Sequence, residues 1–168
     1  MEQAVNNRTD NLKRWLDLQR GDFPPGQSIQ LPMLSGSMLP LLVPGHDIVI
    51  EAVSWRECRR GDIIVFRQEE KLTAHRLLLP VPYVDSALFY QKGDANDFGG
   101  WIRSHQVVGV VAAVKTASGG RLDLREKNAR TTARFEARRQ LARDLWARVL
   151  YLPRKVWQRV RRRAGGTT

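Results

Sequence analysis

The positions of hydrophobic and polar residues divide the chain into three segments. In the first, Leu12, Trp15 and Leu16 follow helical spacing after Thr9, a residue type that caps helix N-termini. The breaker FPPGQ follows this pattern. The spacing therefore predicts a short amphipathic helix and a linker within residues 1–27.

Residues 28–124 have the pattern of short β-strands. The apolar or alternating stretches are SIQLPML, DIVIEAV, DIIVFRQ, KLTAHRLLL, ALFYQKG and QVVGVVAAVKT, with GRLDL as a candidate last strand. Each is bounded by Gly, Pro or Asp, and most contain β-branched residues. So many short strands in about a hundred residues predict a mainly β fold, a strongly coiled antiparallel domain.

Residues 125–168 are rich in Ala, Arg, Leu and Glu, which favour helices. A rough apolar stripe is predicted from the hydrophobic positions Phe135, Leu141, Leu145, Trp146, Val149 and Leu152. Pro153 is expected to interrupt or kink the helix. The sequence thus predicts a basic helical extension after the β domain.

Composition and charge add to this picture. The 168 residues are 42% hydrophobic, enough for one domain with a core and an appendage. The net charge is +11, and the segment from Arg121 onward contains all of the excess, with 15 basic and four acidic residues. Residues 1–120 hold 13 of each, so the sequence describes a neutral body and a cationic tail.

Cysteine content and hydropathy exclude several classes of protein. Cys58 is the single cysteine, which excludes an internal disulfide and a cysteine-only metal site. We expect no metal and no cofactor, and we interpret Cys58 as a spare or a half-buried thiol. No stretch is typical of a secretory signal peptide or long and apolar enough to span a bilayer, so the expected location is the cytoplasm.

The cationic tail suggests a partner. Residues 125–163 combine arginines with leucines and the aromatic residues Trp146, Tyr151 and Trp157, a composition typical of helices that lie on anionic membranes. This would make the protein peripheral at the membrane. Phosphate contacts with nucleic acid rank lower, since no base-reading motif is present. The plainer alternative is a helix packed on the body or on a partner protein.

The stretch LSGSMLPLLVPGHDIVI, beginning at Leu34, is the candidate for chemistry. It places two serines and a glycine among apolar residues and prolines, which predicts a hydroxyl presented from a partly buried, rigid turn. A serine is a poor nucleophile unless a neighbouring base takes its proton. The three histidines, His46, His75 and His105, are the candidate bases, because an imidazole titrates near neutral pH.

Five short motifs occur in a fixed order over residues 30–115: SGSMLP, RGDIIVF, LTAHRLL, KGDAN and VVGVV. This series resembles the type I signal peptidase family, part of a superfamily with self-cleaving repressor-type proteases. With a histidine in the third motif, the chain resembles the Ser–His branch of this family, which occurs in archaea, in the endoplasmic reticulum and in spore formers. The chain departs from the family in GHD after the serine motif and in having no transmembrane anchor.

The resemblance implies roles for individual residues. Ser37 would be the nucleophile and His75 the general base, while the Ser35 hydroxyl and the Ser37 backbone N–H would hold the oxyanion. Asp94 resembles the acidic residue near the dyad and would orient His75, although a turn-capping role is an equal alternative. Asp97 is the other possible third acid.

The expected function is therefore that of a serine endopeptidase that cleaves a leader, signal or propeptide segment from a peptide or protein substrate. Met38, Leu39 and Leu77 would shape shallow pockets for small side chains, or they belong to the core. The alternative is a non-catalytic peptide-binding or regulatory module of the same fold, docked to a membrane or partner by its basic helix. The sequence leaves the oligomeric state open.

Overall fold

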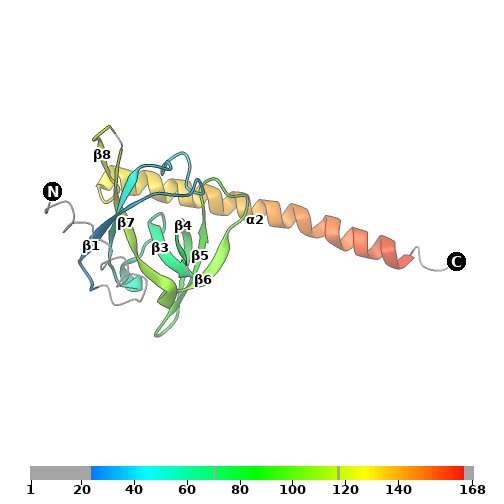
Figure 1. The fold of residues 1–168 in the computed structure, drawn as a ribbon. Helices are drawn as coiled ribbons and strands as arrows, with labels where there is room; N and C mark the ends of the chain where they lie inside the picture. The colour runs from blue at the N-terminus through cyan, green and yellow to red at the C-terminus, as the bar shows by residue number, and fades with distance from the viewer. Residues whose placement is uncertain (1–23, 70, 117, 165–168) are drawn as a thin grey trace.

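The computed structural model describes residues 24–69, 71–116 and 118–164, with side chains described up to Arg148. The helix predicted within residues 1–27 lies outside these residues, and only the end of the predicted linker lies within them. The chain forms an eight-stranded sheet and one long helix, α2 (Figure 1). The strands are β1 Ser28–Pro32, β2 Asp47–Glu51, β3 Ile63–Gln68, β4 Lys71–Pro82, β5 Ala87–Lys92, β6 Gly100–Arg103, β7 Val107–Lys115 and β8 Arg121–Asp123.

Two short 3₁₀ helices, Trp55–Glu57 and Ser104–Gln106, connect strands, and α2 spans Lys127–Ala164. The strand order is β1-β2-β7-β3-β4-β5-β6, and β8 pairs with β7. Every pairing is antiparallel, and bulges interrupt the β2–β7, β3–β7 and β4–β5 ladders. Bulges bend a strand and increase its twist, which suits a coiled sheet. The prediction of a mainly antiparallel β domain followed by a helix is confirmed.

The apolar run IIVF in β3 is buried on both sides of the sheet. Ile63 and Val65 belong to one hydrophobic cluster, with residues of β1, β2 and β7. Ile64 and Phe66 belong to a second cluster, with residues of β4, β5 and β6. Successive side chains of a strand point to opposite faces, so a strand covered on both faces needs an unbroken apolar run.

The first half of α2 packs on the body instead of extending from it as a separate tail (Figure 1). Ala137 is fully buried against Leu78 and Tyr90. Gly61, with φ of +96°, lies so close to α2 that a Cβ there would be 2.8 Å from the Ala133 carbonyl carbon. The first part of the predicted basic extension therefore lies against the β domain.

A buried ionic cluster ties α2 to the sheet. Asp144 is 2% exposed, and its carboxylate accepts hydrogen bonds from Lys92 Nζ at 2.7 Å, Tyr90 OH at 2.6 Å and the Gly99 N–H at 3.0 Å. Arg148 donates to the Tyr90 hydroxyl at 2.8 Å. Burial would raise the pKa of Asp144, but these hydrogen bonds together lower it.

Over its described part, the predicted apolar stripe does not form the face of α2 that docks on the body. Phe135, Leu145 and Trp146 are exposed, and Leu141 alone packs partly against the body. The docking face is instead built from the small or polar residues Ala133, Ala137, Gln140 and Asp144. Close backbone approach at Gly61 requires small residues, and the buried Lys92 requires an acid. The predicted stripe residues Val149 and Leu152 have side chains outside the described part.

Pro153 does not end α2, which continues to Ala164. Among the described residues, no helix combines the length and apolar character needed to cross a bilayer.

Candidate functional site

The serine motif forms a tight turn between β1 and β2. The Leu39 N–H donates to the Gly36 carbonyl at 3.1 Å, and the Leu42 N–H donates to the Met38 carbonyl at 3.0 Å. Met38 and Leu42 are fully buried in the first hydrophobic cluster. Ser37, which directly precedes Met38, is half-buried. The apolar residues of the motif therefore anchor the turn, and its serine stays accessible.

The two serines of the motif lie together. Ser35 is exposed, and its Oγ is 3.2 Å from the Ser37 Oγ. Two hydroxyls at this distance share a hydrogen bond. An atom that reacts at Ser37 would therefore have a second hydroxyl within reach, as an oxyanion donor requires.

The Ser37 backbone is fixed against the KGDAN motif, which directly follows β5. Its carbonyl accepts a hydrogen bond from the Ala95 N–H at 2.9 Å. A Cβ on Gly93 would lie 2.6 Å from the same carbonyl oxygen, closer than a real contact allows. Glycine is needed at position 93 because no side chain fits between this strand end and the serine turn.

His75 lies on β4, beside the same strand end. Arg76 pairs with Lys92 in the β4–β5 ladder, so extending the antiparallel register by one position puts His75 opposite Gly93. Directly opposed residues project to the same face of a sheet, with Cβ atoms about 5 Å apart. A Cβ on Gly93 would meet the Ser37 carbonyl, so the serine turn approaches the strand end that continues the β4–β5 ladder past Arg76 and Lys92.

The ring of His75 is held by neighbouring side chains. Its Nδ1 is 2.5 Å from Oε1 of Gln91, a buried β5 residue, and the edge of the Phe66 ring packs against it with centroids 5.8 Å apart. The amide oxygen can only accept, so Nδ1 carries the proton and Nε2 has the free lone pair. Burial lowers the pKa of His75, while the Gln91 hydrogen bond and the Asp94 charge oppose this shift.

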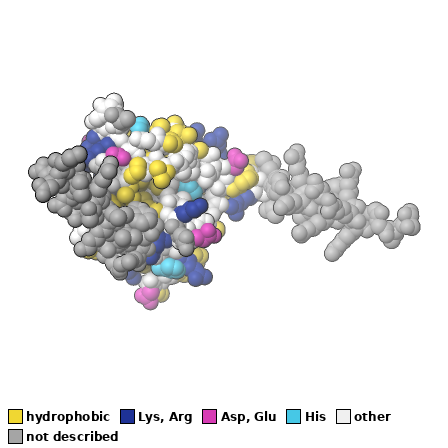
Figure 2. Space-filling model, viewed as in Figure 1, with side chains coloured by type: hydrophobic (Ala, Val, Ile, Leu, Met, Phe, Trp, Pro, Cys, Tyr) yellow, Lys and Arg dark blue, Asp and Glu magenta, His cyan; other side chains and the backbone are white. Residues whose placement is uncertain are grey.

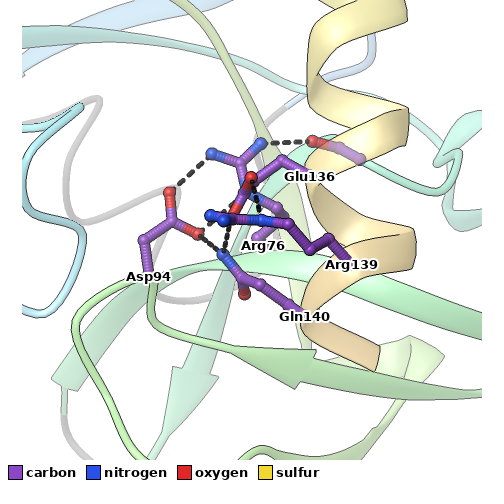
Figure 3. A network of polar contacts seen from close by, with 6 residues as sticks. Arg76, Asp94, Glu136, Arg139 and Gln140 are labelled. Carbon is purple, nitrogen blue, oxygen red and sulfur yellow. Dashed lines mark hydrogen bonds and ion pairs between the residues drawn. The ribbon is translucent and has the colours of Figure 1, made fainter. Parts of the chain in front are cut away.

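Asp94 hydrogen-bonds to Arg76 and Gln140 (Figure 3). Its carboxylate accepts from Arg76 Nε at 2.8 Å and Nη2 at 2.6 Å, and from Gln140 Nε2 at 2.8 Å. Arg76 follows His75 in the strand and so projects to the opposite face. The side chain that hydrogen-bonds to His75 Nδ1 is Gln91, and not Asp94 as expected. Asp94 acts on His75 through its charge alone, which raises the pKa of the imidazole.

The same cluster connects the site to α2. Gln140 also donates to Glu136 at 3.1 Å, and Glu136 pairs with Arg139 at 2.8 Å. Figure 3 shows these three α2 side chains pointing toward Arg76 and Asp94. Helix α2 therefore supports the strand end that carries the KGDAN motif.

The remaining sequence candidates lie elsewhere. Asp97 is exposed in a bend beyond KGDAN, and His105 is exposed on the 3₁₀ helix Ser104–Gln106. His46 is half-buried at the end of the serine loop, with its Nδ1 unpartnered. Among the proposed pocket residues, Met38 and Leu77 are fully buried core residues, whereas Leu39 is 40% exposed.

Cys58 is buried, and burial, with a smaller contribution from the Asp62 charge, raises its pKa to about 12. A thiol of this kind is not a nucleophile at neutral pH. Within the described part of the chain, no group of His, Cys, Asp or Glu side chains is placed to hold a metal ion.

A pocket of about 500 Å³ lies between α2 and the sheet, lined by Arg76, Asp94 and Gln140 among other residues. Neither Ser37 nor His75 lines it, so we locate the candidate site by the serine turn and not by the pocket. Sequence reasoning missed Gln91 and Gln140. No sequence pattern distinguishes a functional glutamine from any other glutamine in a strand or a helix. Only the strand register and the packing of α2 show that Gln91 contacts His75 and that Gln140 contacts Asp94.

No match to this chain was found among protein-family models, curated proteins or solved structures.

Proposed function

We propose that this protein is a serine endopeptidase of the signal-peptidase type, with Ser37 as nucleophile and His75 as general base. The single observation that carries the proposal is the close approach of the Ser37 carbonyl to Gly93, because extending the β4–β5 register by one pair would set His75 opposite Gly93. The order of the sequence motifs and the coiled antiparallel sheet support the same fold type.

The reaction follows from the properties of these groups. His75 Nε2 takes the hydroxyl proton while Ser37 Oγ attacks the carbonyl carbon of the peptide bond. The resulting oxyanion accepts hydrogen bonds from the Ser35 hydroxyl and the Ser37 N–H. The imidazolium then protonates the leaving amine, the C–N bond breaks, and an acyl-Ser37 ester remains. Water hydrolyses the ester with His75 again as base.

Gln91 gives this arrangement a neutral third member. Its Oε1 fixes the tautomer with Nε2 free, which is the first task of the aspartate in a Ser-His-Asp triad. An amide dipole stabilises the imidazolium less than a carboxylate would. The lowered pKa of His75 matches this role, because the ring is neutral and ready to accept a proton near pH 7.

The substrate we propose is a peptide or protein with an apolar leader, signal or propeptide segment. Leu34, directly before the two serines, is 85% exposed, and Leu39 after them is 40% exposed. These side chains border the turn and would contact apolar residues next to the cleaved bond. An extended substrate would be held mainly through backbone hydrogen bonds.

A serine-directed fluorophosphonate probe tests the proposal. We expect the wild-type protein to be labelled, with the adduct located on Ser37 by peptide mass spectrometry. Ser37→Ala and His75→Ala should both abolish labelling, because the first removes the nucleophile and the second removes the base. Ser118→Ala, which removes an exposed serine of the β7–β8 turn, is the matched control and should label normally.

Circular dichroism of each variant establishes that loss of labelling is not loss of fold. A wild-type protein that stays unlabelled across pH 6–9, in buffer and in detergent, would favour the non-catalytic module. Labelling of the Ser37→Ala variant at the wild-type rate would assign the reactivity to another residue and refute the site.

A further inference from the structure

The side of α2 that points away from the body takes no part in the candidate site. Phe135 and Trp146 are 70% and 67% exposed. Eleven residues separate them, close to three helical turns, so they lie on one side of the helix. Ala137, Gln140 and Asp144, which contact the body, are on the opposite side. The body thus uses one face of α2 and leaves an apolar face uncovered.

Basic side chains border this apolar face. Arg138 and Arg143 are exposed on the same turns. Lys127–Ala164 as a whole holds 13 Lys and Arg against two acidic residues. Both acids have partners within the protein, since Glu136 pairs with Arg139 and Asp144 with Lys92. The charge that α2 presents outward is therefore almost entirely positive.

The pattern continues where α2 leaves the body. Figure 2 shows hydrophobic side chains at this point with a basic and an acidic side chain beside them, and in Figure 1 the helix extends beyond the sheet. On an ideal helix with about 3.6 residues per turn, the sequence positions Val149, Val156, Trp157 and Val160 fall on the same side as Phe135 and Trp146. The helix is continuous to Ala164, so one stripe of apolar positions runs from the docked half into the extended half.

We propose that this outward face of α2 binds the surface of an anionic lipid bilayer. Large apolar side chains with arginines at their edges are the chemistry of interfacial helices, whose rings enter the headgroup region while the guanidinium groups contact lipid phosphates. A second copy of the chain fits less well, because two such helices would bring like charges together. The inference stands apart from the peptidase proposal, since it uses none of the residues assigned to catalysis.

Flotation of the full chain with lipid vesicles tests this surface. Wild-type protein should float with vesicles of phosphatidylcholine and phosphatidylserine, and not with phosphatidylcholine alone, and high salt should weaken the binding. Phe135→Ala with Trp146→Ala, and separately Arg138→Gln with Arg143→Gln, should each weaken binding about tenfold or more. Alanine favours helices, so the first pair leaves α2 intact.

Matched controls remove similar groups elsewhere. Val84→Ala shortens an apolar side chain exposed in the β4–β5 turn, and Lys71→Gln with Arg103→Gln removes two exposed charges from the sheet. These variants should float like the wild type. Equal loss of binding in control and test variants would overturn the proposal, as would wild-type protein that fails to float with anionic vesicles.

Two further results would assign the face to another partner. If vesicles are not bound and light scattering finds a dimer that Phe135→Ala with Trp146→Ala dissociates, the face is an interface between copies. If vesicles are not bound and a single-stranded RNA is bound in a salt-dependent way that Arg138→Gln with Arg143→Gln weakens, the face belongs to nucleic acid.

Discussion

The buried carboxylate of Asp144 should be among the most important single groups for holding α2 on the sheet. Asp144→Leu would remove the partner of Lys92, whose charge is itself buried. Loss of one member of a buried ion pair typically costs about 3–5 kcal/mol, because the remaining charge is left without compensation. With a urea m-value of about 2 kcal/mol per molar, the unfolding midpoint should fall by about 2 M.

A double-mutant cycle separates the ion pair from its surroundings. Lys92→Met combined with Asp144→Leu removes both charges and should recover much of the lost stability. The Gly99 N–H would still lack its acceptor, which keeps the double variant about 1–3 kcal/mol below the wild type. Tyr90 OH retains its hydrogen bond from Arg148.

The assay is urea unfolding followed by circular dichroism, with Arg139→Gln as the control, because Arg139 is the more exposed member of the Glu136–Arg139 ion pair of α2. The control should leave the midpoint within error. The pKa of Asp144 is lowered, so its contribution is complete above the ordinary carboxyl pKa and is lost as pH falls through the lowered value. A midpoint shift for Asp144→Leu no larger than that of the control would refute the docking of α2 through this cluster.

Three further outcomes concern the candidate site. The pKa of His75 is lowered, so kcat/KM should rise with pH along an acid limb centred below pH 6.5. Gln91→Glu should move that limb to higher pH, because a carboxylate beside the ring favours the imidazolium; an unmoved limb would exclude contact between residue 91 and the base. Ser35→Ala should lower kcat by about 10²–10³ with Ser37 still labelled by the fluorophosphonate, whereas unchanged turnover would remove Ser35 from the oxyanion site. Cys58 should resist iodoacetamide at pH 8 in the folded protein and react in denaturant, as thiol titration would report, because burial raises its pKa to about 12; rapid reaction of the folded protein would contradict that burial.

Local pattern was enough to predict the β domain and the serine turn. The stretches that alternate between apolar and polar residues, and those that are continuously apolar, form strands. An alternating pattern fits a strand buried on one face, and a continuous apolar run fits a strand buried on both faces. Met38 and Leu42 are the buried anchors of a turn that the mixture of serine, glycine and apolar residues already suggested. The helix after residue 125 likewise followed from its composition, and its existence did not depend on where it docks.

The partner of His75 and the buried face of α2 were decided only by the tertiary structure. Gln91 reaches the imidazole because strand register sets it diagonally across from His75, and register joins residues 16 positions apart. The largest apolar residues of α2 do not face the body, because the sheet there offers the close backbone of Gly61 and the charge of Lys92, which select alanine and aspartate. The amino-acid sequence by itself determines which segments become strands or helix, since those preferences are local; which side chains meet depends on contacts between distant segments, and only the folded chain brings these together.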